Sequence, residues 1–189
     1  GGFIGSALAG WWEVMNERLA DPRHRFAFRD LLTGHCSMTR ATFDLVGAFD
    51  ESLWCHEDFE FGFRALTHGV SIRFAHGADA EHRDGSDLAK ILQRKRDEGR
   101  ADVQLARMHP SMTPALPLGR PFAASRAAGL MHRLALRRSR VLDRLVPAAL
   151  RASMALFEAL RMRDRWRTAL YRAMDFCYWS GVRAEAGTA

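Results

Sequence analysis

The sequence predicts an α/β fold followed by a helical C-terminal extension. Residues 28–40, FRDLLTGHCSMTR, have the pattern of a short strand or strand pair that reaches Gly34. Residues 70–74, VSIRF, alternate apolar and polar side chains, as a half-buried strand does. From residue 122 to 183 apolar residues instead recur at helical spacing, with arginine on the other side. Strand patterns therefore belong to the first part of the chain, and helical patterns alone to the last part.

Two helices are predicted before the acidic region of the chain. The first covers residues 6–19: Ser6 opens it, and Asp21-Pro22 ends it because a residue before proline avoids the helical conformation. The second is a turn or two within residues 40–47, RATFDLVG, and its glycine stops it. The AFDESL stretch that follows is predicted to be a turn, in which Asp50 can hydrogen-bond to its own backbone.

A longer helix is predicted within residues 56–69, HEDFEFGFRALTHG. Apolar residues recur along it at i, i+4 and i+7, namely Phe59, Phe63 and Leu66. Glu60 and Arg64 are spaced as an i,i+4 ion pair, and Gly69 is the expected C-terminal stop. The strand at residues 70–74 follows directly.

The second half of the chain is predicted to be helical apart from a proline-rich linker. A loop at residues 77–86 leads into a polar helix from Asp87 to about Arg107. Residues 111–121 belong to the proline-rich stretch and are predicted to form the linker. These features divide the chain into a domain at residues 1–110, the linker, and a basic helical extension at residues 122–183.

Charge is unevenly distributed along the chain. Residues 1–119 carry 14 basic and 17 acidic side chains, a net charge of −3, whereas residues 120–183 carry 14 basic and 4 acidic side chains, a net charge of +10. A mildly acidic domain therefore precedes a basic extension. The extension can pack on the domain, lie on an anionic membrane surface, or bind nucleic acid. Nucleic acid is not expected as a partner, because the extension lacks a helix-turn-helix spacing, a zinc pattern and interleaved stacking aromatics.

Cysteine and hydropathy patterns indicate a cytoplasmic setting. Cys36, Cys55 and Cys177 show no C-x-x-C spacing, which argues against a disulfide framework and against a zinc module. No run of about 18 apolar residues lacks a charge, so no membrane-spanning segment is expected. The first residues carry neither a basic region nor a cleavage pattern, so we expect no signal peptide and expect the chain to be part of a longer protein.

An ordered set of motifs between Phe28 and Pro110 resembles the second half of a family 2 glycosyltransferase. The set comprises Thr33-Gly34, Ser37, Arg40, the VGAFDESLW turn, the HEDFEFGFRALTHGV helix and His82. In that family the corresponding features are a T-G-N-x-S-x-x-R stretch, a G-G-F-D-E turn, an E-D pair that opens a D-x-G-x-R-L helix, and a later histidine. Two positions depart from the family pattern: His35 replaces the asparagine, and Ala48 replaces the second glycine of the turn.

The resemblance implies a partial GT-A fold, which is the mixed sheet of nucleotide-diphospho-sugar transferases. The matching region is also similar to the C-terminal region of galactosyltransferases. The implied reaction transfers a sugar from a nucleotide-sugar donor to a hydroxyl acceptor with inversion. The family's nucleotide-binding strands and D-x-D metal motif precede the matching region, so this chain is expected to supply the acceptor side and the catalytic base. The implied cofactor is a divalent metal, Mn²⁺ or Mg²⁺, whose main carboxylate ligands are expected outside this chain.

Asp58 is the candidate catalytic base. Inverting transfer needs a group that takes the proton of the acceptor hydroxyl as it attacks the anomeric carbon, and a carboxylate can do this. The N-terminus of a helix favours the ionised carboxylate. Glu57 is expected to orient Asp58 or to hold an acceptor hydroxyl. The alternative for both residues is a carboxylate that only stabilises the first helical turn, and Glu60 is assigned to its ion pair with Arg64.

Four further residues are candidates for the substrate or metal site. By the resemblance, His82 is a metal ligand beside the D-x-D carboxylates, and its alternative is a histidine in an exposed loop. Trp54 can stack on a sugar ring or can anchor the turn to the core. His35 and Arg40 are candidate substrate-binding residues. Their alternatives are a structural role for His35 and a salt bridge for Arg40.

These features together predict a hexosyltransferase-like enzyme of cell-envelope polysaccharide synthesis. Its expected partners are the nucleotide-sugar donor, a carbohydrate or lipid-linked acceptor, and the anionic inner face of a membrane, to which it would bind peripherally. The alternative is a non-catalytic fragment that acts as an interaction or membrane-docking module.

Overall fold

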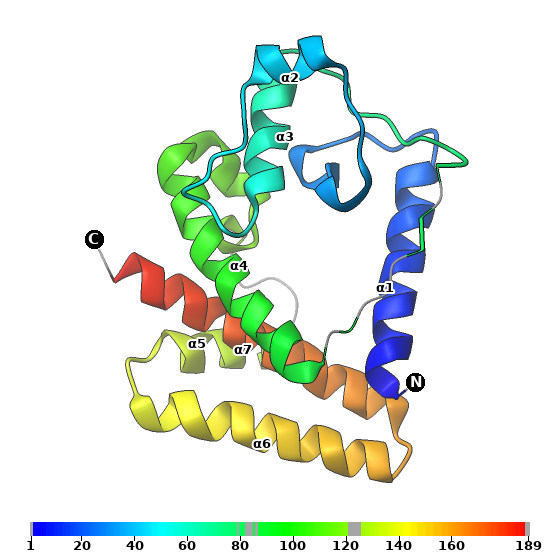
Figure 1. The fold of residues 1–189 in the computed structure, drawn as a ribbon. Coiled ribbons are helices and arrows are strands. Elements are labelled where there is room, and N and C mark those ends of the chain that lie inside the picture. The colour runs from blue at the N-terminus through cyan, green and yellow to red at the C-terminus, as the bar shows by residue number, and fades with distance from the viewer. Residues whose placement is uncertain (1, 79, 82–84, 86, 121–125, 188–189) are drawn as a thin grey trace. The chain divides into compact units, whose positions relative to one another are not determined.

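The computed structural model describes residues 2–78, 80–81, 85, 87–120 and 126–187. Seven α-helices and four short 3₁₀ helices lie within these residues, and no strand does (Figure 1). In chain order they are α1 (Phe3–Ala20), η1 (Phe28–Asp30), η2 (Thr33–His35), α2 (Arg40–Val46), α3 (Glu57–Thr67), α4 (Leu88–Met108), η3 (Pro110–Ala115), η4 (Pro117–Gly119), α5 (Arg126–Leu136), α6 (Arg140–Ala159) and α7 (Arg163–Ala186).

The prediction of an α/β fold, and with it the partial GT-A mixed sheet, is therefore wrong for the described residues. At residues 28–40, local side-chain hydrogen bonds replace the expected strand. The Asp30 carboxylate accepts the Ala27 backbone N–H at 2.9 Å and contacts His24 Nε2 at 2.9 Å, which closes the turn of η1. Thr39 caps α2 by accepting the backbone N–H of Thr42 at 3.1 Å. Such bonds compete with the ladder that a strand needs.

The second expected strand, residues 70–74, has the predicted burial without the predicted pairing. Val70, Ile72 and Phe74 are half-buried, and the residues between them are exposed. A strand also needs a hydrogen-bonded neighbour, and no other segment among the described residues provides one. The Val70 N–H instead donates to the Ala65 carbonyl at 2.9 Å, just after Gly69 with its φ of 75°. This bond closes the C-terminus of α3.

The helix predictions are confirmed with small shifts of their ends. The structure contains α1, α2, α3 and α4 where the sequence predicts helices, and the described part of residues 122–183 is helical in α5, α6 and α7. The proline-rich segment folds into η3 and η4 against α4, with Met112 and Leu116 buried. The described chain divides into two compact units, which we call the N-terminal unit (Leu8–Gly85) and the C-terminal unit (Gly1–Ala7 with Ser86–Ala189).

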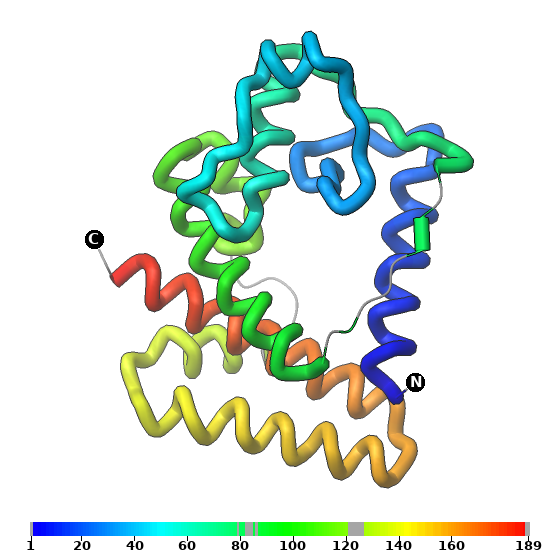
Figure 2. The backbone as a smooth tube through the Cα atoms, in the orientation of Figure 1, coloured from blue at the N-terminus to red at the C-terminus, as the bar shows by residue number. Residues whose placement is uncertain are grey.

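In the C-terminal unit, α7 is the central helix. It runs between α4 and α6 and also contacts α5 (Figure 1). Helices α6 and α7 are antiparallel neighbours joined by a tight turn at residues 160–162 (Figure 2). A cluster of buried apolar residues lies where α6 and α7 pack against the start of α4. It comprises Leu92, Met154, Trp166, Ala169, Leu170 and Ala173.

Two glycines let the backbones of α4 and α7 approach each other closely. A Cβ atom on Gly99 would lie 2.1 Å from the Tyr178 carbonyl oxygen, and a Cβ atom on Gly181 would lie 1.9 Å from the Arg96 carbonyl oxygen. Both glycines are buried. No larger residue fits at either position without separating the helices.

The N-terminal unit has a smaller, aromatic core beneath α3. Phe61 stacks on Phe49 with ring centroids 4.6 Å apart, and Val46 and Ala65 are buried beside it. Gly62 lies directly against η1, since a Cβ atom there would be 2.6 Å from the Phe28 carbonyl oxygen. The packing of α3 on α2 and η1 fixes where the first turn of α3 begins.

Candidate functional site

The candidate site is the N-terminal turn of α3 with the loop that enters it. His56 precedes the helix in a left-handed conformation, with a φ of 62°, and its ring stacks on Phe59 with centroids 4.1 Å apart. Glu57 and Asp58 then occupy the first helical turn, and both are half-buried. The Oδ1 atom of Asp58 accepts the backbone N–H of Phe59 at 2.9 Å. The structure therefore holds two carboxylates at the positive end of the α3 dipole.

The third acidic residue of this turn has a structural role. Glu60 is 2% exposed, and both of its carboxylate oxygens accept the Nε–H of Arg64, at 2.8 and 2.9 Å. Arg64 also donates to the carbonyl oxygens of Val46 and Ala48, the latter at 2.7 Å. The predicted i,i+4 pair is confirmed, and it additionally ties α3 to the turn after α2. Glu60 is thereby occupied, which leaves Glu57 and Asp58 as the candidates for chemistry.

The loop before α3 presents Trp54 to solvent. The side chain of Trp54 is 74% exposed, whereas its neighbour Leu53 is buried and anchors the loop. Asp50 shapes the preceding turn by accepting the Ser52 backbone N–H at 2.9 Å, as the sequence predicts. Because Leu53 already provides the anchor, the indole of Trp54 is available for an apolar ligand face. Trp54, Glu57 and Asp58 thus belong to one loop-and-turn segment.

His35 and Arg40 lie on other elements of the N-terminal unit. His35 ends η2 and is exposed. Arg40 begins α2, where its Nε atom lies 3.3 Å from Oδ1 of Asp44 in an exposed i,i+4 pair. The salt bridge considered for Arg40 is therefore present, although a pair this exposed is weak and exchanges readily with other anions.

A metal site does not assemble from the described residues. His82 lies outside them, and the rest of the described chain contains no group of three or more His, Cys, Asp or Glu side chains placed to hold an ion. Divalent cations of this class take several oxygen ligands. The described residues consequently do not fit a metal centre, and we derive no chemical step through one.

The C-terminal unit contains a buried polar pair that the sequence analysis missed. The hydroxyl of Tyr178 in α7 donates to Oδ2 of Asp102 in α4 at 2.5 Å, and both residues are buried. Burial, followed by the adjacent Asp102 carboxylate, raises the pKa of Tyr178 far above its ordinary value. The one available sequence signal is that Asp102 falls between Gly99 and Leu105 on the buried face of α4.

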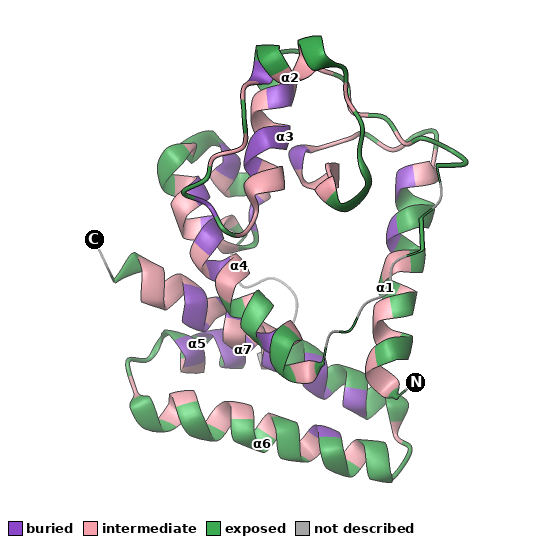
Figure 3. Ribbon diagram, viewed as in Figure 1, coloured by how far each residue is buried: buried purple, intermediate pink, exposed green. Residues whose placement is uncertain are grey.

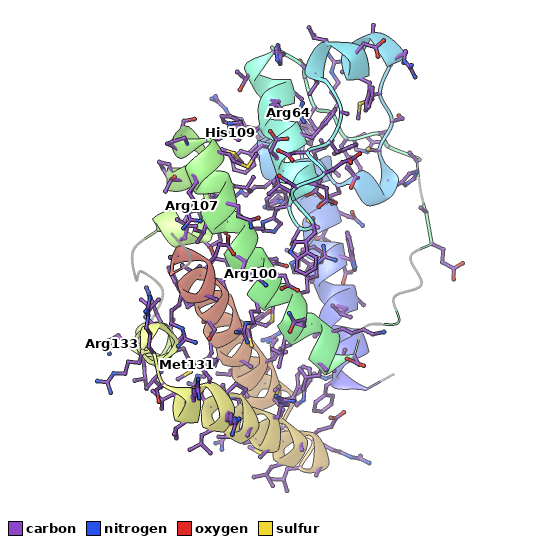
Figure 4. All side chains as sticks on the ribbon, turned by 60° about the vertical axis from the view of Figure 1, so that its left-hand side comes forward. Arg64, Arg100, Arg107, His109, Met131 and Arg133 are labelled. Atoms are coloured by element: carbon purple, nitrogen blue, oxygen red, sulfur yellow. The ribbon has the colours of Figure 1, made fainter. Side chains whose placement is uncertain are left out.

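A second polar link between α4 and α7 centres on Glu185. Its carboxylate accepts from Arg100 Nε at 3.4 Å and from Gln104 Nε2 at 3.1 Å, while Arg107 donates to its backbone oxygen at 3.1 Å. Arg100 and Arg107 lie two turns apart on α4 (Figure 4). Together with the Tyr178–Asp102 pair, these contacts fix the register of the two helices. Their role is therefore structural.

A shallow basic hollow of about 270 Å³ lies at the N-terminus of α6. It is lined by Arg138, Ser139, Arg140, Asp143 and Arg183. Arg183 already donates to both carboxylate oxygens of Asp143, at 2.8 and 2.9 Å, and Ser139 caps α6 by accepting the Leu142 backbone N–H. These contacts neutralise part of the positive charge of the hollow.

Comparison of this chain with protein-family models, with curated proteins and with solved structures finds no match in any of the three. None of the described helices is both long enough and apolar enough to cross a membrane.

Proposed function

We propose that this chain supplies the acceptor side and the catalytic base for inverting transfer of a sugar from a nucleotide-sugar donor to a hydroxyl group. The observation that carries the proposal is the pair of half-buried carboxylates, Glu57 and Asp58, in the first turn of α3, which follows a loop with the exposed indole of Trp54. The motif order from Thr33 to Gly69, which resembles that of family 2 glycosyltransferases, supports the same function.

In the proposed reaction the Asp58 carboxylate removes the proton of the acceptor hydroxyl. The acceptor oxygen forms its bond to the anomeric carbon as the bond from that carbon to the diphosphate oxygen breaks, and the nucleoside diphosphate leaves with the electron pair. Attack from the face opposite the leaving group inverts the anomeric centre. General-base catalysis of this kind contributes about 10²–10⁴-fold to a rate.

The neighbouring residues support this role of Asp58. Glu60 cannot compete for the acceptor, because Arg64 binds both of its oxygens. The α3 dipole favours the ionised form of a carboxylate in its first turn. Trp54 offers an indole face that matches the apolar face of a pyranose ring, and Glu57 lies one residue from the base, where it can accept a second acceptor hydroxyl.

The test is transfer of sugar by the native full-length polypeptide from a panel of uridine and guanosine diphosphate sugars to carbohydrate and lipid-linked acceptors. We expect transfer that depends on Asp58, and a product whose anomeric configuration, read by proton NMR, is opposite to that of the donor. Transfer with retention, or no transfer from any donor in the panel, would contradict the proposal. In the second case the alternative of a non-catalytic interaction module gains support.

A further inference from the structure

Helix α6 has two apolar sides, and only one of them is covered. On its inner side, Leu150, Met154 and Phe157 pack into the core cluster with Trp166 of α7. The opposite side carries a second set of apolar residues, all of them exposed, which we call the outer stripe: Val141, Leu145, Ala148, Ala152, Ala155, Leu156 and Ala159. Figure 3 shows exposed residues along the whole length of α6.

The spacing of the outer stripe forms one continuous surface. At about 100° per residue, its seven members lie within roughly 100° of each other on the side opposite Leu150. The three large members, Val141, Leu145 and Leu156, are 63%, 61% and 56% exposed. A helix that is apolar on both sides is normally buried on both sides, and a contiguous exposed apolar surface marks a docking site.

Arginines follow one edge of the outer stripe. Arg140, Arg144 and Arg151 are spaced at i, i+4 and i+11 and are exposed, and in the part of the chain that the structure describes none of them forms an ion pair. More arginines follow in the first turns of α7, at Arg163, Arg165 and Arg167. An apolar face bordered by arginine is the arrangement that binds a helix in the plane of an anionic lipid surface.

Charge argues against a second copy of the chain as the partner. Helix α6 has two acidic residues, and Asp143 is bound by Arg183. If two stripes packed together, three arginines on each helix would border the joint, with one carboxylate per helix, Glu158, left to offset them. Anionic lipid headgroups supply the missing negative charge, and acyl chains cover the apolar side chains.

We propose that the outer stripe, together with Arg140, Arg144 and Arg151 along its edge, docks α6 parallel to the surface of an anionic lipid bilayer. The leucines enter the boundary between headgroups and acyl chains, about 5–10 Å deep, and the arginines contact the lipid phosphates. The net charge of +10 over residues 120–183 draws the protein to the surface before insertion. This inference does not depend on the sugar-transfer proposal, since none of its residues lies in the N-terminal unit.

Vesicle co-sedimentation of the full chain tests this proposal. The vesicles are phosphatidylcholine alone, and phosphatidylcholine mixed with phosphatidylglycerol, each at low and high salt. We expect binding to the mixed vesicles that weakens with salt, and little binding to the neutral vesicles. The double variant Leu145→Gln/Leu156→Gln should bind at least about tenfold more weakly, because two leucines lose their burial. Arg144→Gln/Arg151→Gln should also bind at least about tenfold more weakly, since each arginine near an anionic surface contributes about fivefold.

Matched control variants distinguish docking through α6 from nonspecific adsorption to vesicles. Leu45→Gln removes an exposed leucine of α2, and Arg94→Gln removes an exposed arginine of α4, so both should bind as the wild type does. All variants should keep the helical circular dichroism of the wild type, because every changed side chain is exposed. Unchanged binding by the leucine double variant, or equal binding to neutral and anionic vesicles, would overturn the proposal. It would also be overturned by a wild-type dimer that binds no vesicles and that the same variant dissociates, because a second copy would then cover the stripe.

Discussion

Tyr178 donates its hydroxyl to Oδ2 of Asp102 across the joint between α4 and α7, at a distance of 2.5 Å. Both side chains are buried, and Gly99 lies one turn before Asp102, where it meets the backbone of Tyr178 itself. Because burial and the Asp102 carboxylate raise the pKa of Tyr178, the phenol is protonated at neutral pH and donates to the carboxylate. The polar pair and the glycine contact together define how α7 sits on α4.

Removing this hydroxyl should destabilise the C-terminal unit. Tyr178→Phe removes one hydrogen-bond donor from the buried Asp102 carboxylate, so we expect the free energy of unfolding to fall by about 1–3 kcal/mol in a urea titration. Tyr171→Phe is the matched control, because that tyrosine lies on the same helix and is 56% exposed. Equal stability of the two variants would show that the pair contributes nothing to the joint.

A methyl group at the helix contact should be costly for a different reason. In Gly181→Ala the new Cβ atom would meet the carbonyl oxygen of Arg96, a backbone atom that cannot move aside without shifting α4. We expect a loss of at least about 2 kcal/mol in the free energy of unfolding. Gly5→Ala, where nothing lies within 4 Å, should instead be neutral or stabilising by up to about 1 kcal/mol. The check is the thermal unfolding of the two variants, measured side by side. A Gly181→Ala variant as stable as the wild type would show that α4 and α7 do not pack in this register.

The ion pair under α3 should behave as a unit. Arg64→Met removes the cation that pairs with the buried Glu60 carboxylate, and it also removes the donor to the Val46 and Ala48 carbonyls. We therefore expect the free energy of unfolding to fall by about 3 kcal/mol. The double variant Glu60→Leu/Arg64→Met should lose less than Arg64→Met alone, because no charge then remains buried. A double-mutant cycle by chemical denaturation measures the difference, and strictly additive losses would argue against coupling of the two residues.

Acidification should weaken the C-terminal unit through His132. This histidine is buried, stacks on Trp179 with ring centroids 3.6 Å apart, and has a pKa lowered by burial. In the unfolded chain this imidazole binds a proton near pH 6.5, whereas in the folded chain it binds one only at lower pH. The free energy of unfolding should therefore fall as the pH is lowered from 7.5 to 5.5, by at most about 1.4 kcal/mol per pH unit. The carboxyl of Asp175, whose pKa is raised chiefly by burial, acts in the opposite direction at lower pH.

The check is the slope of stability against pH in His132→Gln compared with His68→Gln, an exposed histidine at the end of α3. The first variant should flatten the slope, and the second should not. Parallel slopes for wild type and His132→Gln would exclude His132 as the titrating group.

The sequence predicts the helices of this protein well because their signals are local. The i,i+4 pair of Glu60 and Arg64, the stop at Gly69 and the cap at Asp87 each lie within a few residues of the structure they determine, and α3 and α4 follow accordingly. The strand predictions fail because a strand depends on a partner elsewhere. The alternating burial of residues 70–74 is present, yet pairing is not a property of those residues alone.

The candidate site divides in the same way. Trp54, Glu57 and Asp58 could be proposed from sequence because they lie within five consecutive residues, in the loop before one helix and in its first turn. The Tyr178–Asp102 pair joins residues 76 positions apart, and no local sequence pattern predicts it. The outer stripe of α6 was visible only as part of an amphipathic pattern, since sequence alone does not tell which apolar side of a helix is covered.

The role of Asp58 as the base is decided by the turnover of Asp58→Asn in the native full-length polypeptide. The amide keeps the shape of the side chain and removes the base, so we expect turnover to fall at least about a hundredfold while nucleotide-sugar affinity and unfolding temperature stay unchanged. Glu51→Gln, an exposed acidic residue of the preceding turn, is the matched control and should retain full activity. An Asp58→Asn variant that keeps more than about a tenth of the wild-type turnover would remove Asp58 from the role of base.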